Sequence, residues 1–227
     1  MNRHAKNTIE AGRPVIAVNP GGYAMPVVDA LAKSGADCLF IDCERTAVSV
    51  ESVPMMARAA QAHGLSAIVR SYSKDAATLT RYFDCGIDGL VLPQVESAEE
   101  CARLRAIARA ATRGREGTLL LIAQIESVDG HNRLDEIAGA PGIDLILVGP
   151  NDLAHSMGFL GDTGRPEVIA AVDDITARLA ARSVPFGLPV TQETAGLWVG
   201  RGARFLYTTV EQLLKPALGA LRTAAGA

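Results

Sequence analysis

LLLIAQIE at residues 119–126 and IDLILVGPNDL at residues 143–153 share one pattern, a short apolar run that ends on polar groups. Runs of this length, bounded by Gly, Pro and acidic residues, are typical of strands buried on both faces of a parallel sheet. Glu126 follows the first run and Asp152 follows the second. A buried strand has no use for a carboxylate unless its charge is compensated. The pattern therefore indicates either a site for a hard cation or acidic caps on the helices that follow.

Alternating strand and helix patterns run along the whole chain. The expected strands are residues 15–18, 38–42, 67–70, 89–93, 119–125, 145–148, 186–190 and 205–208. The expected helices are residues 25–33, 53–62, 76–83, 98–111, 134–138, 168–182, 195–199 and 213–224. This alternation implies parallel strands with right-handed crossovers, and its eight units predict a closed (β/α)8 TIM barrel of the α/β class. We expect a single domain over residues 1–227.

An open, doubly wound Rossmann sheet is the competing fold for such an alternation. It is disfavoured because Gly21-Gly22 is not followed by the third glycine of a dinucleotide-binding fingerprint. No linker rich in Pro, Gly or Ser divides the chain into two parts.

Composition narrows the class of protein. The net charge is −3 and aromatic residues make up 4% of the chain, which leaves no basic surface or stacking platform for nucleic acid. No apolar run reaches 18 residues, so we expect no membrane span. Residues 1–14 carry charges and lack the apolar centre of a signal peptide. The four cysteines form no C-x-x-C pair, which fits free thiols in a cytoplasmic protein.

Polar residues gather at the expected carboxyl ends of the strands, where TIM barrels carry their chemistry. They are Asp42, Glu44, Arg45, Arg70, Gln94, Gln124, Glu126, Asn151, Asp152, Thr191, Gln192, Thr208 and Thr209. A cation bound by carboxylates, with one arginine beside it, suits a small 2-oxo acid. The cation chelates the acid, and Arg70 stabilises the negative oxygen of the enolate. The alternative for Arg70 is a salt bridge to an acidic residue at a strand end.

Five stretches in this order resemble the HpcH/HpaI family of class II, metal-dependent pyruvate aldolases, which are related to the citrate lyase β-subunit group. They are FIDCE at 40–44, IVR at 68–70, LVLPQVESAEE at 90–100, QIES at 124–127 and VGPNDL at 148–153. The resemblance implies that Glu126 and Asp152 bind Mg²⁺, Mn²⁺ or Co²⁺. It also implies a pyruvate-like 2-oxo acid as substrate. The protein is then a homo-oligomer, a trimer or hexamer, whose last helix packs on a neighbouring barrel.

The resemblance also assigns roles to the other strand-end residues. Arg70 faces the enolate oxygen, Gln124 lies beside the oxo acid, and Asp42 and Glu44 lie near metal-bound water. The substrate carboxylate is held by the backbone amides of the turn formed by Gly149, Pro150, Asn151 and Asp152.

The chain departs from the family pattern in two places. Most aldolases of the family have Gly-Glu-His where this chain has Cys43-Glu44-Arg45. That histidine is the usual acid/base group and pairs with an aspartate that matches Asp84. Arginine stays protonated and cannot replace it as a base, so we expect Arg45 to pair with Asp84 or to hold a second anionic group of the substrate. The family segment that shapes the acceptor side of the site is also shortened here, to residues 108–117.

The sequence thus predicts a metal-dependent carbon–carbon lyase, an aldolase that cleaves or forms 4-hydroxy-2-oxo acids through a pyruvate enolate. Two alternatives stay open. One is a 2-oxo acid decarboxylase or a citrate-lyase-like acyl cleavage, which needs enolate stabilisation but not the missing histidine. The other is a non-catalytic barrel that binds metal and oxo acid.

Overall fold

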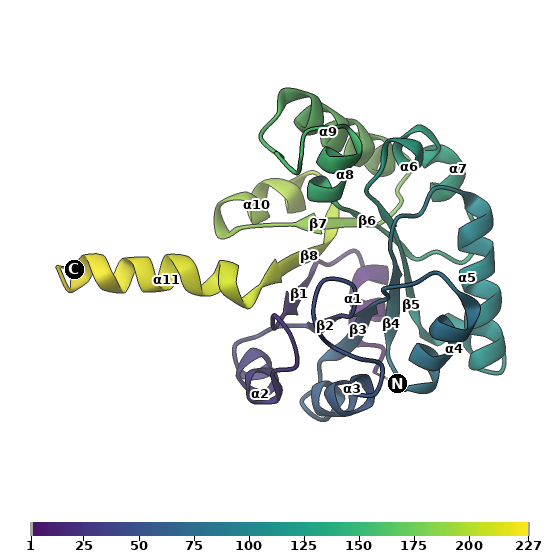
Figure 1. Cartoon of the computed structure of the whole chain (residues 1–227), viewed down its shortest axis with the longest axis horizontal. Helices are drawn as coiled ribbons and strands as arrows, with labels where there is room; N and C mark the ends of the chain where they lie inside the picture. Colours follow the sequence, from purple (N-terminus) through teal and green to yellow (C-terminus); the bar gives the residue numbers. More distant parts are fainter. Residues whose placement is uncertain (1, 227) are drawn as a thin grey trace.

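Eight parallel strands close a barrel in the computed structural model, which describes residues 2–226 (Figure 1). Each strand pairs with the next, and the last returns to the first with Val15 opposite Phe205 and Asn19 opposite Thr209. The predicted TIM barrel is therefore confirmed. The predicted domain was residues 1–227, and its first and last residues lie outside the described part of the chain.

The strands and helices have the following bounds. The strands are β1 Val15–Asn19, β2 Cys38–Asp42, β3 Ser66–Arg70, β4 Gly89–Leu92, β5 Leu120–Ile125, β6 Leu145–Val148, β7 Phe186–Pro189 and β8 Ala203–Thr209. The helices are α1 His4–Glu10, α2 Met25–Lys33, α3 Val53–Ala62, α4 Ala76–Asp84, α5 Ala98–Ala111, α6 Val128–Asn132, α7 Leu134–Ala138, α8 Pro150–Ser156, α9 Pro166–Ala181, α10 Gln192–Gly200 and α11 Val210–Ala224. A 3₁₀ turn, Glu116–Thr118, precedes β5.

Three short helices were not predicted: α1, α6 and α8. Each has only five or seven residues, which is too few for a helical period to emerge from the sequence. Helix α1 closes the amino-terminal end of the barrel. Its Ala5 and Ile9 join the apolar cluster inside the barrel, and its Lys6 forms an ion pair with Asp144.

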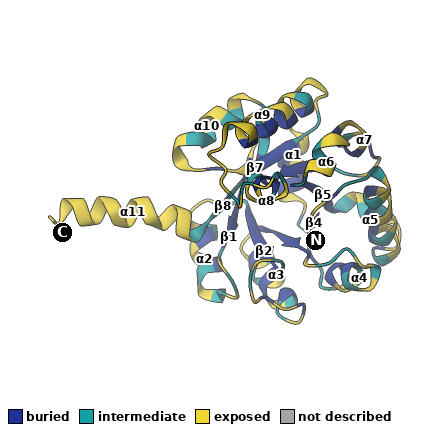
Figure 2. Cartoon of the chain, turned by 45° about the horizontal axis from the view of Figure 1, so that its top comes forward, coloured by how far each residue is buried: buried dark blue, intermediate teal, exposed yellow. Residues whose placement is uncertain are grey.

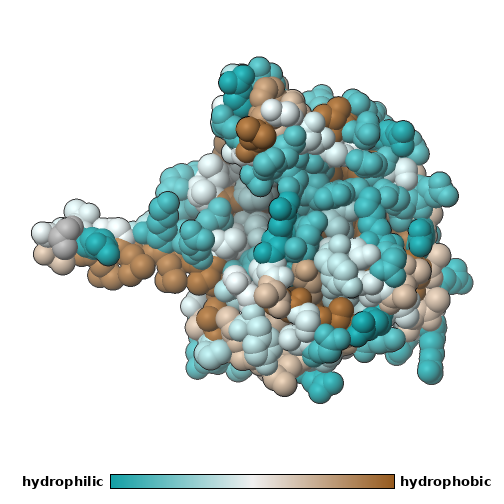
Figure 3. Space-filling view, viewed as in Figure 1, coloured by the Kyte–Doolittle hydropathy of each residue, from teal (hydrophilic) through white to brown (hydrophobic). Residues whose placement is uncertain are grey.

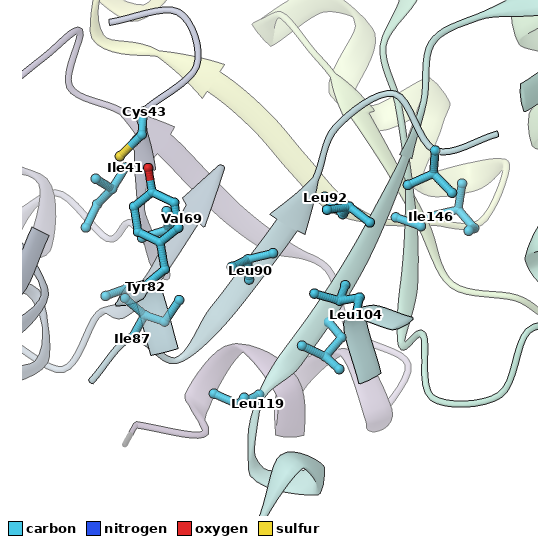
Figure 4. Close-up of a cluster of buried hydrophobic side chains, with 14 of the residues drawn as sticks. Ile41, Cys43, Val69, Tyr82, Ile87, Leu90, Leu92, Leu104, Leu119 and Ile146 are labelled. Atoms are coloured by element: carbon cyan, nitrogen blue, oxygen red, sulfur yellow. The ribbon is translucent and has the colours of Figure 1, made fainter. Parts of the chain in front are cut away.

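Alternation along the strands produces two apolar layers, which appear as buried strands in Figure 2. Inward-facing side chains such as Phe40, Ile68 and Phe205 fill the barrel. Outward-facing side chains pack against the surrounding helices, as Figure 4 shows for Ile41 and Val69. Because the side-chain period of a strand is two, each strand presents one set of residues to each layer.

The inward-facing series turns polar toward the carboxyl ends of the strands. Asn19 continues the inward series of β1, Asp42 that of β2, Arg70 that of β3, Gln124 that of β5, and Tyr207 that of β8. Asp42 and Arg70 lie opposite each other in the β2–β3 register. The barrel therefore brings side chains that are far apart in the sequence to one end of its interior.

Helix α11 departs from the barrel and projects away from it (Figure 1). None of its residues is buried, and Leu213, Leu214, Leu218 and Leu221 are exposed. Figure 3 shows their apolar surface as a continuous band along one side of the helix. Within residues 2–226, no helix is both long enough and apolar enough to cross a membrane.

Candidate functional site

The buried carboxylate of Asp42 connects most of the polar groups at the carboxyl end of the barrel. Its Oδ1 accepts hydrogen bonds from the backbone amides of Glu44 and Arg45, both at 3.1 Å. Arg70 binds it with two nitrogens, Nε to Oδ1 at 3.0 Å and Nη2 to Oδ2 at 2.6 Å. Asn19 Nδ2 donates to Oδ2 at 3.2 Å. Five donors occupy this carboxylate, so it orients its neighbours and has little capacity left to accept a substrate proton.

Arg70 therefore forms the salt bridge considered as an alternative from the sequence, and it also reaches the candidate site. Its Nε lies 3.2 Å from Oε2 of Glu44, in addition to its contacts with Asp42. Burial disfavours the charge of Arg70, but the hydrogen bonds and charges of Asp42 and Glu44 outweigh this effect and raise its pKa. The guanidinium still lines the cavity described below, so the ion pair positions it without withdrawing it from the site.

Glu44 is the carboxylate in this network with an oxygen that can still accept a hydrogen bond. Its Oε2 is buried and accepts no hydrogen bond from residues 2–226, although Arg70 lies beside it. Burial raises the pKa of Glu44, and the positive charges of Arg70 and Arg45 oppose that shift. A carboxylate with a raised pKa and a free lone pair is chemically suited to accepting a proton.

Arg45 pairs with Asp152, and not with Asp84, which was one of the two partners expected from the sequence. Its Nη2 contacts Asp152 Oδ1, and this contact raises the pKa of Arg45. Asp84 is the last residue of α4 and is exposed. A helix that follows a barrel strand runs back toward the amino-terminal end, so within one chain Asp84 lies at the far end of the barrel from Arg45. The predicted Arg45–Asp84 pair is therefore wrong for the single chain.

Glu126 is almost fully buried and is held from two sides. The backbone amide of Gln94 donates to its Oε1 at 2.9 Å, and Gln124 Nε2 donates to its Oε2 at 2.5 Å. Gln94 has a positive φ of 51°, which is uncommon for a residue other than glycine and points its N–H at the carboxylate. Lys74 Nζ secures this conformation by donating to the Gln94 carbonyl at 2.6 Å. Gln94 thus contributes its backbone to the site, while its side chain is exposed.

Negative charge accumulates around Glu126. Burial raises its pKa to about 8, the hydrogen bond from Gln94 opposes this shift, and the charges of Glu44 and Asp152 add to it. Gln124 Oε1 is buried and has no hydrogen-bond partner among residues 2–226. A buried carboxylate without a salt-bridge partner, beside an amide oxygen without a hydrogen bond, fits a hard cation, which prefers oxygen ligands. The described residues contain no group of three or more His, Cys, Asp or Glu side chains arranged to hold a metal. One or two protein carboxylates suffice, however, where water and substrate complete the shell.

The turn after β6 brings a glycine against Glu126. A Cβ atom on Gly149 would lie 2.6 Å from Glu126 Oε2 and 3.0 Å from Gln124 Nε2, so only glycine fits at this position. The Gly149 amide donates to the Ile125 carbonyl at 2.9 Å, and Pro150 has no N–H. Of the four residues expected to hold a carboxylate through backbone amides, only Asn151 and Asp152 therefore have amides available for a ligand.

A cavity of about 240 Å³ opens between these groups. Its walls are formed by Phe40, Arg45, Arg70, Gln124, Leu147, Val148, Gly149, Pro150, Asn151, Asp152, Pro189 and Tyr207. Its polar lining includes the carboxylate of Asp152, the side-chain amide of Gln124 and the guanidinium of Arg70. Its volume suits a small acid with a second small reactant, because ligand pockets of drug-sized molecules begin at about 300 Å³.

Some strand-end residues named from the sequence have structural roles. Thr191 and Thr209 take part in capping boxes that begin α10 and α11. Tyr207 was not predicted as a site residue, because it occupies the inward-facing position before Thr208 and Thr209, the last residues of β8. The alternation Phe205, Tyr207 in β8 is the signal that would have found it.

Comparisons with known proteins agree on one family. Residues 22–195 match the family described as HpcH/HpaI aldolase/citrate lyase. The chain is similar to a pyruvate aldolase from Rhizobium etli, at 32% identity over 92% of this chain and 91% of that protein. It is 28% identical to a 4-hydroxy-2-oxo-heptane-1,7-dioate aldolase from Salmonella paratyphi C, over 94% of this chain and 90% of the other. The crystal structure of an HpcH/HpaI aldolase from Desulfitobacterium hafniense superposes with a TM-score of 0.85 at 25% identity, covering 96% and 95% of the two chains.

Proposed function

We propose that this chain, which belongs to the HpcH/HpaI aldolase/citrate lyase family, is a carbon–carbon lyase that cleaves or forms 4-hydroxy-2-oxo acids through a pyruvate enolate. The family membership predicted from the motifs is confirmed. The observation that carries the proposal is that Asp152 and Arg70 line one small cavity, while Glu126 lies directly behind two of its lining residues, Gln124 and Gly149. Carboxylates for a cation and an arginine for a developing negative charge are the two requirements of enolate chemistry.

Glu126 and Asp152 would hold the divalent ion, which we propose to be Mg²⁺, Mn²⁺ or Co²⁺. When bound, the ion would act as a Lewis acid that polarises the ketone of the oxo acid. The amides of Asn151 and Asp152 hold the substrate carboxylate, and Arg70 donates to the oxygen that becomes negative. Glu44 accepts a proton at Oε2, directly or through water, because that oxygen accepts no hydrogen bond within residues 2–226 and burial raises the pKa of the Glu44 carboxyl.

The proposed assembly is a homo-oligomer, a trimer or hexamer, built through α11. An isolated helix with an exposed apolar face is not stable in water, so that face needs a partner. The barrel offers exposed apolar side chains near the start of α11. Ile16 on β1 and Leu197 on α10 are 43% and 53% exposed, and both elements adjoin β8, from which α11 continues. A second copy whose α11 packs there would cover both surfaces. We also propose a cytoplasmic location, since all four cysteines are free.

The direct test of the proposed function is the exchange of pyruvate methyl protons in D₂O with Mn²⁺ present, followed by proton NMR. Arg70→Ala is a poor probe, because it would leave the buried Asp42 without its main counter-charge. Arg70→Lys keeps a positive charge beside Asp42 but lacks the guanidinium nitrogens that face the cavity. We expect Arg70→Lys to slow exchange by about 100- to 1,000-fold, as when one oxyanion donor is lost.

The control is Arg81→Lys, which makes the same change in an exposed pair with Glu51. It should exchange at the wild-type rate. A wild type that releases no methyl protons, but binds pyruvate, would favour the non-catalytic binding protein. Turnover of oxaloacetate without retro-aldol cleavage of any 4-hydroxy-2-oxo acid would favour the decarboxylase.

The second prediction concerns Arg45, which takes the place of the family histidine. We propose that Arg45 holds a second carboxylate of the substrate, since its half-exposed guanidinium already pairs with a carboxylate at the cavity rim. Arg45→His should then raise retro-aldol turnover of monocarboxylate 4-hydroxy-2-oxo acids at least tenfold, because general acid–base catalysis is worth about 100- to 10,000-fold. It should weaken the preference for dicarboxylates at the same time.

Steady-state kinetics on paired mono- and dicarboxylate substrates measures both effects. Arg103→His on the exposed face of α5 is the matched control and should change neither. If Arg45→His folds normally and the ratio of the two substrates stays constant, Arg45 does not select the second carboxylate.

The third prediction tests the assembly through α11. The double substitution Leu214→Glu and Leu218→Glu places two charges on the apolar face of the helix. Light scattering after size-exclusion chromatography should show the wild type as an oligomer and this variant as a monomer, because buried unpaired charge is costly. Lys215→Glu on the polar face should assemble like the wild type. A monomeric wild type, or an oligomer that survives the double substitution, would disprove the assignment of this helix to the interface.

A further inference from the structure

Tyr207 has a hydroxyl group whose hydrogen-bonding direction is determined by neighbouring residues. Its ring continues the inward series of β8 and packs edge-on against Phe40, with ring centroids 4.7 Å apart and an interplanar angle of 68°. This contact fixes the ring in the floor of the cavity, which Tyr207 lines. The phenol is therefore held at a defined place and is not a mobile side chain at the rim.

Asn19 determines the direction of that hydrogen. The backbone amide of Gly21 donates to Asn19 Oδ1 at 2.8 Å, which identifies Oδ1 as the acceptor end of the amide. The other end, Nδ2, donates to Asp42 at 3.2 Å and to the Tyr207 oxygen at 3.0 Å. The carboxylate of Asp42 accepts only, so Nδ2 cannot exchange places with Oδ1. The Tyr207 oxygen must therefore accept from Asn19, and its own O–H is free to donate elsewhere.

Arg70 has a free donor at the same cavity. Its Nε and Nη2 are used by Asp42, while Nη1 donates to no group within residues 2–226. Arg70 and Tyr207 both line the cavity and both contact Phe40: the Arg70 Cζ lies 5.9 Å from the centroid of the Phe40 ring, against which Tyr207 packs. Burial raises the pKa of the Tyr207 phenol above its ordinary value, so it keeps its proton at neutral pH. Two donors without a protein acceptor thus face one small space.

We propose that the Tyr207 hydroxyl and the Arg70 guanidinium together form an oxyanion hole for the enolate oxygen of the bound 2-oxo acid. The inference deepens the proposed function and rests on it. Preorganised donors stabilise an oxygen that gains charge during the reaction more than they stabilise the neutral ketone. Tyr207 is then a catalytic residue that donates a hydrogen bond and transfers no atom. Asn19 is a positioning residue that acts through it.

The test compares Tyr207→Phe with the wild type in two measurements. Oxalate is a planar dianion with negative charge where the enolate oxygen would lie, whereas pyruvate has a neutral ketone there. With Mn²⁺ present, calorimetry should show that Tyr207→Phe binds oxalate at least tenfold more weakly and pyruvate less than about twofold more weakly. Exchange of pyruvate methyl protons should fall by about 100-fold. Tyr23→Phe, which removes an exposed hydroxyl outside the cavity, is the control and should match the wild type.

Each outcome decides a separate point. Equal loss of oxalate and pyruvate affinity in Tyr207→Phe would mean that Tyr207 only shapes the cavity, and it overturns the inference. Wild-type behaviour of the variant in both measurements overturns it as well, while the proposed function stands. A wild type that neither exchanges pyruvate protons nor binds oxalate overturns the proposed function and this inference together.

Discussion

The buried ion pair between Asp42 and Arg70 is the interaction on which the candidate site depends. A guanidinium inside a barrel is tolerated only if a carboxylate meets it, and removing one partner of such a pair typically costs about 3–5 kcal/mol. Asp42 accepts five hydrogen bonds, two of them from Arg70. The other three hold the Asn19 side chain and the backbone amides of Glu44 and Arg45 in place. One carboxylate therefore orients the arginine of β3, the amide of β1 and the loop after β2. The ion pair that the fold needs in order to bury Arg70 thus also positions the side chains of the candidate site.

The charge of Glu126 is less well balanced than that of Asp42. Arg70 is neutralised by Asp42 and partly by Glu44, and Glu126 forms no salt bridge within residues 2–226. Glu126 accepts hydrogen bonds from the Gln94 amide and the Gln124 side chain, and burial raises its pKa although the bond from Gln94 opposes this shift. Burying a carboxylate without a counter-charge destabilises the fold, and binding a ligand can offset that cost. A carboxylate with a strongly shifted pKa beside a cavity therefore indicates a functional site. Glu126 is a candidate cation ligand for this reason. Asp152 is a candidate because its carboxylate lines the adjoining cavity, where its partner is Arg45.

Much of this arrangement could be predicted from the sequence. The strands are continuous apolar runs, so their number, order and approximate bounds followed from composition, and the polar residues that ended them indicated Arg70, Glu126 and Asp152. What could not be predicted depends on three-dimensional placement. Asp84 had to lie far from Arg45 because α4 returns to the other end of the barrel. The Gly149 amide was already used by Ile125, and Gln94 acts through its backbone. Tyr207, by contrast, could have been predicted, because its alternation with Phe205 marks it as an inward-facing residue of β8.

The titration of the protein with Mn²⁺ at pH 6.5 and pH 8.5 tests the central claim most directly. A cation binds the ionised form of Glu126, whose pKa is raised to about 8, so protons compete with the metal below that pH. The account predicts that wild-type affinity rises by about tenfold or more between the two pH values. Glu126→Gln should bind much more weakly and lose most of that dependence, and Asp152→Asn should bind weakly as well. Wild-type Mn²⁺ affinity in Glu126→Gln at both pH values would contradict the account.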